Sequence, residues 1–120
     1  MKTIKTNNLQ LINKLVAEHI FGWTLFTHPE LGYKLTGCYK DIRTEVYYYS
    51  TNIFYAWALL DMFNKAEVVK HQKDSYSCTI HLYDTEGIPY NEIRRWGPTV
   101  EIAICLATLE VKGVEVVYEP

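Results

Sequence analysis

The segment from Ser75 to Asp84 alternates between apolar and polar side chains, and this alternation constrains the fold more than any other feature of the chain. Because successive side chains of a strand point to opposite faces, the pattern predicts a β-strand with one face packed under helices. Asp84-Thr85-Glu86-Gly87 follows, with a glycine at its last position that is typical of a turn between antiparallel strands. We therefore predict a hairpin whose returning edge strand runs from Ile88 to Trp96 and tolerates Pro89.

Two further segments have the apolar spacing of amphipathic helices. The first predicted helix runs from Thr6 to Phe21, with Asn7 or Asn8 as its N-cap and Gly22 just beyond its C-terminus. Another predicted helix runs from Thr99 to Lys112, where small alanines permit close approach to a sheet. These two helices lie on either side of the predicted hairpin in the sequence.

The middle of the chain predicts a strand that leads into a third helix. Thr44 to Tyr49 is rich in β-branched and aromatic residues, which favours a strand. Ser50 is then predicted to cap a helix whose apolar positions form one stripe. These positions are Ile53, Ala56, Trp57, Leu60 and Phe63. A last short strand is predicted from Val114 to Tyr118.

The predicted order of elements is helix, strand, helix, hairpin, helix and strand. A chain of 120 residues typically forms one domain, so we expect a single domain over residues 1–120. Helices separated by mostly hairpin-joined strands favour an α+β fold. We therefore predict a small layered α/β/α sandwich with a mainly antiparallel sheet and about three helices.

Charge and hydropathy argue against several classes of protein. The net charge of −2 differs from the strongly positive net charge that is typical of a protein that binds duplex nucleic acid. No apolar run follows Met1-Lys2-Thr3, and no stretch approaches the length of a membrane span. We therefore expect no signal peptide, no contact with a membrane and a location in the cytoplasm.

The three cysteines are Cys38, Cys78 and Cys105, which lie far apart in the sequence. No Cys-x-x-Cys pair occurs, although most structural zinc sites are built from such pairs. We expect free thiols in a reducing compartment, packed as small apolar side chains. The sequence therefore predicts no metal site and no other cofactor.

Three segments resemble, in the same order, motifs of the phage ABA sandwich domain family of small bacteriophage and prophage proteins. Val16 to Trp23 resembles the family opening V-A-E-K-V-M-G-W, and Tyr49 to Trp57 resembles Y-S-T-D-I-x-x-A-W. Pro98 to Ala107 is similar to A-P-x-A-I-C-R-A. The resemblance implies an α/β/α sandwich and a phage or prophage origin, and it implies no activity. One departure is Leu106, which stands where relatives often carry an arginine, so a contact made by that arginine would be missing here.

A candidate ligand site follows from Arg94-Arg95-Trp96, which ends the predicted returning strand just before a helix begins. Arginine side chains bind phosphates, aromatic rings stack on bases, and amides at a helix N-terminus favour an anion. The predicted site consists of Arg94, Arg95, Trp96, Thr99, His81 and Tyr83, with Arg43 and Tyr47 closing it. A structural interpretation stands beside this one: the arginines solvate an edge strand and discourage aggregation, while Trp96 anchors a loop.

The chain is similar in size and fold class to the Thoeris anti-defence sponges, which are compact phage oligomers that sequester cyclic nucleotide signals of bacterial immunity. This similarity implies a non-enzymatic protein that sequesters a small anionic cyclic-nucleotide-type signal in the host cytoplasm. We also expect a homo-oligomer, because small sheets with tyrosine-rich edges tend to pair. Two alternatives stay open. One is an inhibitor that binds a host defence protein through Tyr47-Tyr48-Tyr49, and the other is a phage accessory protein without a counter-defence role.

An enzymatic interpretation has less support. His81 with Asp84, or His28 with Glu30, could pair as a base and the carboxylate that orients it. No serine or cysteine stands in a strained elbow motif, and glycines frame no carboxylate pair. We therefore expect no catalytic activity, with a hydrolase as the residual alternative.

Overall fold

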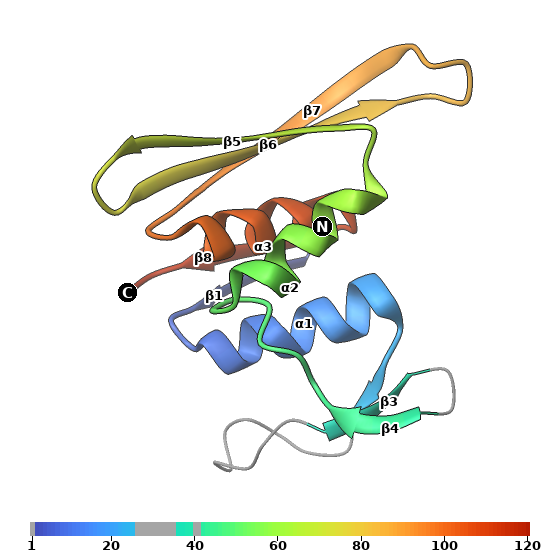
Figure 1. Ribbon diagram of the computed structural model, residues 1–120, viewed down its shortest axis with the longest axis vertical. Helices are drawn as coiled ribbons and strands as arrows, with labels where there is room; N and C mark the ends of the chain where they lie inside the picture. Colours follow the sequence, from blue (N-terminus) through green and yellow to red (C-terminus); the bar gives the residue numbers. More distant parts are fainter. Residues whose placement is uncertain (1, 26–35, 40–41) are drawn as a thin grey trace.

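The computed structural model of the chain describes residues 2–25, 36–39 and 42–120 (Figure 1). Its elements, in order, are β1 (Lys2–Thr6), α1 (Leu9–Phe21), β2 (Thr24–Leu25), β3 (Thr36–Tyr39), β4 (Ile42–Glu45), α2 (Ile53–Ala58), the 3-10 turn η2 (Leu59–Met62), β5 (Lys65–Gln72), β6 (Ser75–Tyr83), β7 (Pro89–Gly97), α3 (Val100–Val111) and β8 (Val114–Tyr118). The strands form an antiparallel sheet β5-β6-β7, a parallel pair β1-β8 and a small antiparallel sheet β2-β3-β4. The predicted α+β sandwich with an antiparallel sheet is confirmed.

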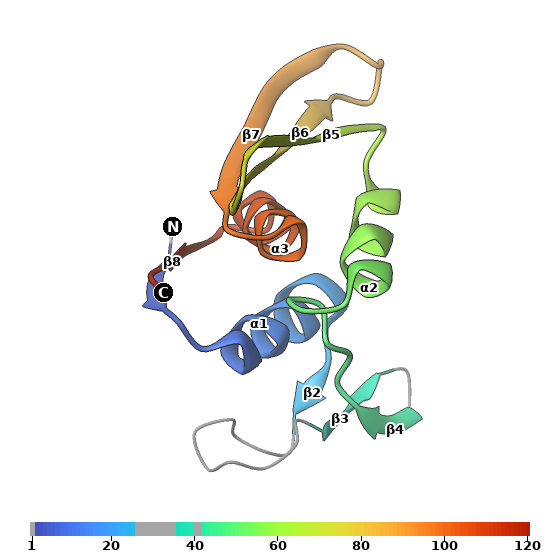
Figure 2. The same cartoon turned by 60° about the vertical axis from the view of Figure 1, so that its left-hand side comes forward.

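Helix α3 lies at the centre of the molecule. Figure 2 shows the β5-β6-β7 sheet on one side of α3, helix α1 on the opposite side and α2 alongside. The helix contacts all three of these layers and also β8. Every residue from Ile102 to Leu109 is buried, which is typical of a helix that packs on all sides. The second face of the β5-β6-β7 sheet points away from the helices (Figures 1 and 2).

Helix α1 confirms the predicted capping residues at both of its ends. The Asn8 side chain accepts hydrogen bonds from the backbone amides of Gln10 and Leu11, and Gly22 adopts the left-handed conformation at φ 73°. The predicted start at Thr6 is wrong. Residues 2–6 instead pair in parallel with β8, and the Asn8 cap allows helical hydrogen bonding only from Leu9 onward.

The hairpin of β6 and β7 is confirmed within one or two residues. One Asp84 carboxylate oxygen accepts from the amides of Glu86 and Ile88, both at 2.9 Å, and Gly87 has a φ of 80°. Strand β5, which pairs with the other edge of β6, is absent from the predicted elements. Strand β5 carries mostly charged and polar residues, and only its Ala66 and Val68 pack on the core. Two core-facing apolar residues are too few to predict a strand from the sequence before its partner strand is known.

The middle segment differs most from its prediction. Strand β4 ends at Glu45, so the predicted strand from Thr44 to Tyr49 is wrong. Tyr49 is buried and stacks on Phe21 at the end of α1, with 5.7 Å between the ring centroids. Because the Tyr49 ring packs on α1, the chain leaves the sheet before α2 begins.

Helix α2 buries a different face from the predicted stripe. Its N-cap is Asn52, whose side chain accepts from the amide of Phe54 at 2.9 Å, and not Ser50. The buried side chains are Ala56, Leu59 and Leu60, whereas Ile53 and Trp57 are half exposed. Helix α2 has only six residues before η2 begins. Because it is so short, only one narrow face of α2 packs on α3, and its other apolar side chains are exposed to solvent.

Ser50 and Asn13 form a buried polar link between α1 and the turn that precedes α2. The Asn13 amide oxygen accepts from both the backbone N–H and the hydroxyl of Ser50, each at 2.8 Å. The Ser50 hydroxyl also lies 3.1 Å from the Leu9 carbonyl oxygen, a second acceptor. Both side chains are 2% exposed, so water cannot replace these bonds.

Among the helices that the structure describes, none is both long and apolar enough to cross a membrane. The longest of them, α1 and α3, have 13 and 12 residues.

We predict that Asn13→Ala lowers the free energy of unfolding by about 1–3 kcal/mol, because it leaves the buried Ser50 N–H without an acceptor. The matched control is Asn7→Ala, the same substitution at an exposed residue, with an expected change within about 0.5 kcal/mol. Urea unfolding followed by circular dichroism measures both. Equal changes in the two variants would contradict the role given to Asn13.

Candidate functional site

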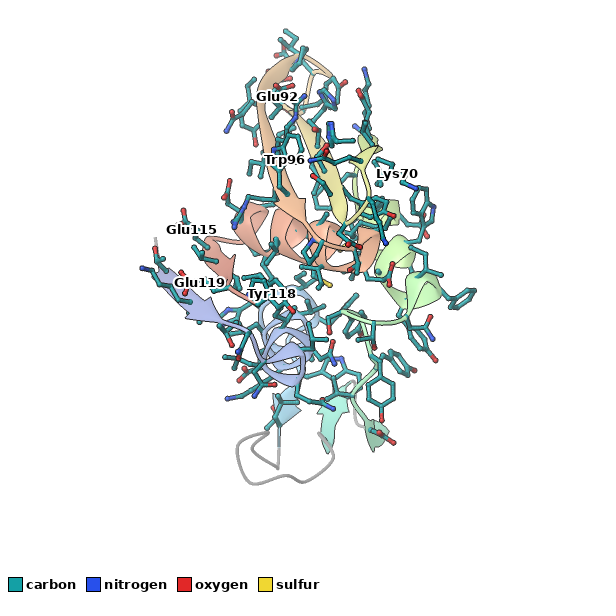
Figure 3. All side chains as sticks on the ribbon, turned by 90° about the vertical axis from the view of Figure 1, so that its left-hand side faces the viewer. Lys70, Glu92, Trp96, Glu115, Tyr118 and Glu119 are labelled. Atoms are coloured by element: carbon teal, nitrogen blue, oxygen red, sulfur yellow. The ribbon has the colours of Figure 1, made fainter. Side chains whose placement is uncertain are left out.

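The face of the β5-β6-β7 sheet that points away from α3 carries a compact group of polar and aromatic side chains. We call it the outer sheet face. Ala66, Val68, Cys78 and Ile80 pack on the core, and the side chains that alternate with such positions point outward. The outer sheet face consists of Lys65, Glu67, Val69, His71, Ser77, Thr79, His81, Glu92, Arg94 and Trp96. Figure 3 shows Glu92 and Trp96 along β7, with Trp96 at the end that leads into α3.

Trp96 is 51% exposed, and its indole ring has a fixed support. The ring stacks on His71 of β5 with 4.0 Å between the centroids and an interplanar angle of 30°. The Nε2 atom of His71 lies 2.8 Å from the hydroxyl oxygen of the buried Ser77. The histidine is thereby held in place, and it holds the indole of Trp96 in turn.

Arg94 lies two residues before Trp96, so both side chains point to the same face. Its Nε–H donates to the hydroxyl oxygen of Thr79 at 2.8 Å, and Thr79 is buried. Among the described residues, Arg94 has no other hydrogen-bond or ion-pair partner. Four of its five guanidinium N–H donors therefore remain available to a ligand.

His81 lies between two carboxylates on the outer sheet face. Its Nε2 atom is 3.0 Å from a Glu67 oxygen, and its Nδ1 atom is 3.5 Å from a Glu92 oxygen. The Lys65 ammonium also lies 3.6 Å from Glu67. Asp84 instead binds the amides of its own turn, so His81 faces Glu67 and Glu92 rather than the predicted partner Asp84. The second predicted pair, His28 with Glu30, falls outside the described residues.

Arg95 points to the opposite side of the sheet from Arg94, so the two arginines do not form one cluster as predicted. Its Nη1 atom lies 3.2 Å from the Glu110 carboxylate of α3, and its Nη2 donates to the carbonyl oxygen of Val116 in β8. Neighbouring residues of a strand point to opposite faces, which is the reason for the separation. Arg95 therefore ties β7 to α3 and β8.

The remaining predicted site residues are dispersed. The Thr99 hydroxyl oxygen accepts from the Ile102 amide at 3.2 Å, and Thr99 caps α3. Tyr83 ends β6, where the pairing with β7 shifts by one residue. Arg43 belongs to β4, which lies on the opposite side of the molecule from β7 (Figure 1), and Tyr47 follows β4 in the sequence. Of the eight predicted residues, the structure brings together Arg94, Trp96 and His81.

A second surface surrounds α2, and we call it the α2 aromatic surface. Its exposed side chains are Tyr47, Tyr48, Ile53, Phe54 and Trp57. Tyr47 stacks on Tyr55 with 4.6 Å between the ring centroids, and Tyr55 meets Phe54 edge to face at 5.8 Å. Tyr47 and Tyr48 belong to the predicted contact residues, whereas Ile53 and Trp57 belong to the predicted apolar stripe of the helix. No local signal in the sequence marks these two side chains as exposed, because their exposure depends on which face of α2 packs on α3.

Cys78 and Cys105 are buried free thiols, as predicted. Burial raises the pKa of the Cys78 thiol to about 12 and also raises the pKa of Cys105, which the nearby charge of Glu101 raises further. Both thiols are therefore protonated at neutral pH and unsuited to act as nucleophiles. The side chain of Cys38 falls outside the description.

A family model described as the phage ABA sandwich domain matches residues 14–109 of the chain. The match includes the three segments whose motifs resemble the family, so the chain belongs to the phage ABA sandwich domain family. No curated protein and no solved structure shows a significant match.

We predict that Arg95→Ala lowers the free energy of unfolding by about 2 kcal/mol, because it leaves the half-buried Glu110 carboxylate without its partner. Arg94→Ala, the neighbouring substitution on the exposed face, should cost less than about 1 kcal/mol. Urea unfolding of both variants tests the prediction. A loss at Arg94 as large as the loss at Arg95 would refute the orientation of the two side chains.

We also predict that Cys78 and Cys105 resist thiol reagents in the folded protein. In a Cys38→Ser variant, Ellman's reagent at about pH 8 should label neither thiol until a denaturant is added, because the raised pKa values and the burial keep both thiols protonated and covered. Rapid labelling of either thiol without denaturant would show that the core opens around α3.

Proposed function

We propose that this member of the phage ABA sandwich domain family is a non-enzymatic binding protein that sequesters a small anionic nucleotide of the cyclic type in the host cytoplasm. The observation that carries the proposal is the pair of Arg94 and Trp96 on the outer sheet face. One side chain supplies a fixed cation and the other a fixed aromatic surface. A nucleotide needs both, for its phosphate and for its base.

The aromatic half of the site is Trp96 on its His71 support. One face of the indole rests on the imidazole, so the opposite face is the surface on which a base would stack. Stacking of a base on an aromatic side chain contributes about 1–3 kcal/mol. Because His71 already orients the indole, little side-chain entropy is lost when a ligand binds.

The cationic half of the site is the Arg94 guanidinium. The bond to Thr79 fixes its stem, and the remaining donors suit a phosphate oxygen pair. Positions two residues apart on a strand lie about 7 Å from each other, a distance that one nucleotide can span between base and phosphate. The carboxylates of Glu67 and Glu92 face His81, so the Trp96 end of the face is the more favourable place for an anion.

Binding without catalysis is supported by the state of the nucleophile candidates. The two described thiols are buried and protonated. His81 is engaged by two carboxylates, and the hydroxyl that lies 2.8 Å from His71 belongs to Ser77, which is 2% exposed and therefore shielded from a substrate. This arrangement favours a binding role over a catalytic one.

A second candidate function is inhibition of a host defence protein by direct contact. The specific observation in its favour is the α2 aromatic surface, because exposed Trp and Tyr side chains are typical anchors of protein interfaces.

We predict that a thermal-shift and calorimetry screen against cyclic ADP-ribose isomers and cyclic di- and trinucleotides will find at least one ligand. Binding to the folded state alone should raise the melting temperature by several degrees at a large excess over Kd. Trp96→Ala and Arg94→Ala should each weaken binding at least tenfold.

Trp57→Ala is the matched control, because Trp57 is equally exposed, at 52%, but lies on the α2 aromatic surface. This variant should bind the ligand like the unmodified protein. The proposal is wrong if no nucleotide of the panel binds, or if binding survives the loss of Trp96 and Arg94 together.

A further inference from the structure

We infer that the α2 aromatic surface is a docking site for an amphipathic polypeptide segment of a partner protein, with apolar anchor side chains and basic residues at its flanks. This inference rests on the second candidate function, the binding of a partner protein, and is independent of nucleotide binding. It assigns a surface and a partner chemistry to that function.

The apolar side chains on the outside of α2 exceed what the fold requires. Ala56, Leu59 and Leu60 already pack this segment against the core. Phe54 is nevertheless 77% exposed and Trp57 is 52% exposed, on the same short helix. A contiguous apolar patch of this kind on a small protein typically marks an interaction site.

The surface is shaped to receive anchor side chains. One hollow of about 400 Å³ is lined by Ile53, Phe54, Trp57, Ala58 and Asp61. A second hollow of about 200 Å³ is lined by Glu45, Val46, Tyr47, Tyr48 and Tyr55. The edge-to-face contact of Phe54 with Tyr55 joins the two hollows into one surface. Two adjacent hollows offer places for two anchor side chains from one face of a bound helix.

The size of the surface favours a segment over a globular partner. Two large aromatic side chains, one isoleucine and two half-exposed tyrosines offer on the order of 500 Å² of apolar area. A stable interface between folded proteins buries roughly 800 Å² on each partner. The available area therefore suits a peptide-sized contact better than a stable dimer built on this surface alone.

The charges around the surface indicate which side chains should flank the anchors of the bound segment. Asp61 lines the larger hollow and Glu45 lines the smaller one, and within the part of the chain that the structure describes no other charged side chain lines either hollow. Asp61 has no ion-pair partner among the described residues. Basic side chains of a bound segment would complement these carboxylates, whereas a second copy in a symmetric contact would bring its own carboxylates to the same interface.

The test uses two designed helical peptides that share a Leu and Phe stripe and differ only in their flanks, which carry lysine in one peptide and glutamate in the other. Fluorescence anisotropy with the full chain should show saturable binding of the lysine peptide and at least tenfold weaker binding of the glutamate peptide. Phe54→Ala and Trp57→Ala should each weaken the lysine peptide at least tenfold, with Trp96→Ala as the matched control that leaves its affinity unchanged.

Asp61→Lys provides a second variant that keeps the apolar surface. It should weaken the lysine peptide and strengthen the glutamate peptide, a reversal that loss of folding cannot produce. Near-ultraviolet circular dichroism verifies that each variant is folded.

Three results would overturn the inference. One is equal binding of both peptides, and another is absence of binding to either. The third is a dimer in sedimentation that Phe54→Ala converts to a monomer, because a second copy would then occupy the surface. A failed nucleotide screen has no bearing on these results, since it probes Trp96 and Arg94 on another face.

Discussion

Burial of α3 on all its sides is the constraint on which the rest of the structure depends. The β5-β6-β7 sheet, α1, α2 and β8 all pack on this one helix, and the buried side chains of the described residues form a single core cluster. The close approach of β7 explains Gly97, because a Cβ atom there would lie 2.8 Å from the backbone nitrogen of Ala103. The one polar side chain inside the helix, Thr108, turns its hydroxyl to the carbonyl oxygens of Ile104 and Cys105. Among the side chains that the structure describes, no buried nitrogen or oxygen atom lacks a hydrogen-bond partner, a lack that would weaken the packing.

Two polar links orient the layers that pack around α3. Arg95 joins β7 to Glu110 of α3 and to the backbone of β8. Asn13 and Ser50 join α1 to the turn before α2. Apolar contacts alone permit sliding of one layer over another, whereas a buried hydrogen bond is satisfied in only one arrangement. Arg95 thereby anchors the strand that carries Arg94 and Trp96. The bonds between Asn13 and Ser50 anchor the turn that leads into α2.

The two candidate surfaces differ in chemistry, and each has one half-exposed tryptophan. Trp96 stands on a polar sheet beside Arg94, a setting that suits a small anion with an aromatic base. Trp57 stands on an apolar helix beside Asp61, a setting that suits an apolar segment with basic flanks. Both surfaces use side chains that the core does not need, so each can be altered without loss of the fold. The two proposals therefore assign nucleotide binding and peptide binding to separate surfaces.

The sequence by itself determined α1, α3 and the β6-β7 hairpin, because capping residues, turn residues and apolar periodicity are local signals. The sequence also implied that Arg94 and Arg95 point to opposite faces, because they are neighbours on a predicted strand. The prediction of one arginine cluster overlooked this alternation. Only the tertiary structure decided that residues 2–6 pair with β8, that the polar β5 completes the sheet and that Trp57 lies outside while Tyr49 lies inside. In each of these cases the deciding partner is distant in the sequence. Whether an apolar side chain becomes core or contact surface depends on whether α3 or α1 reaches it, and no local pattern contains that information.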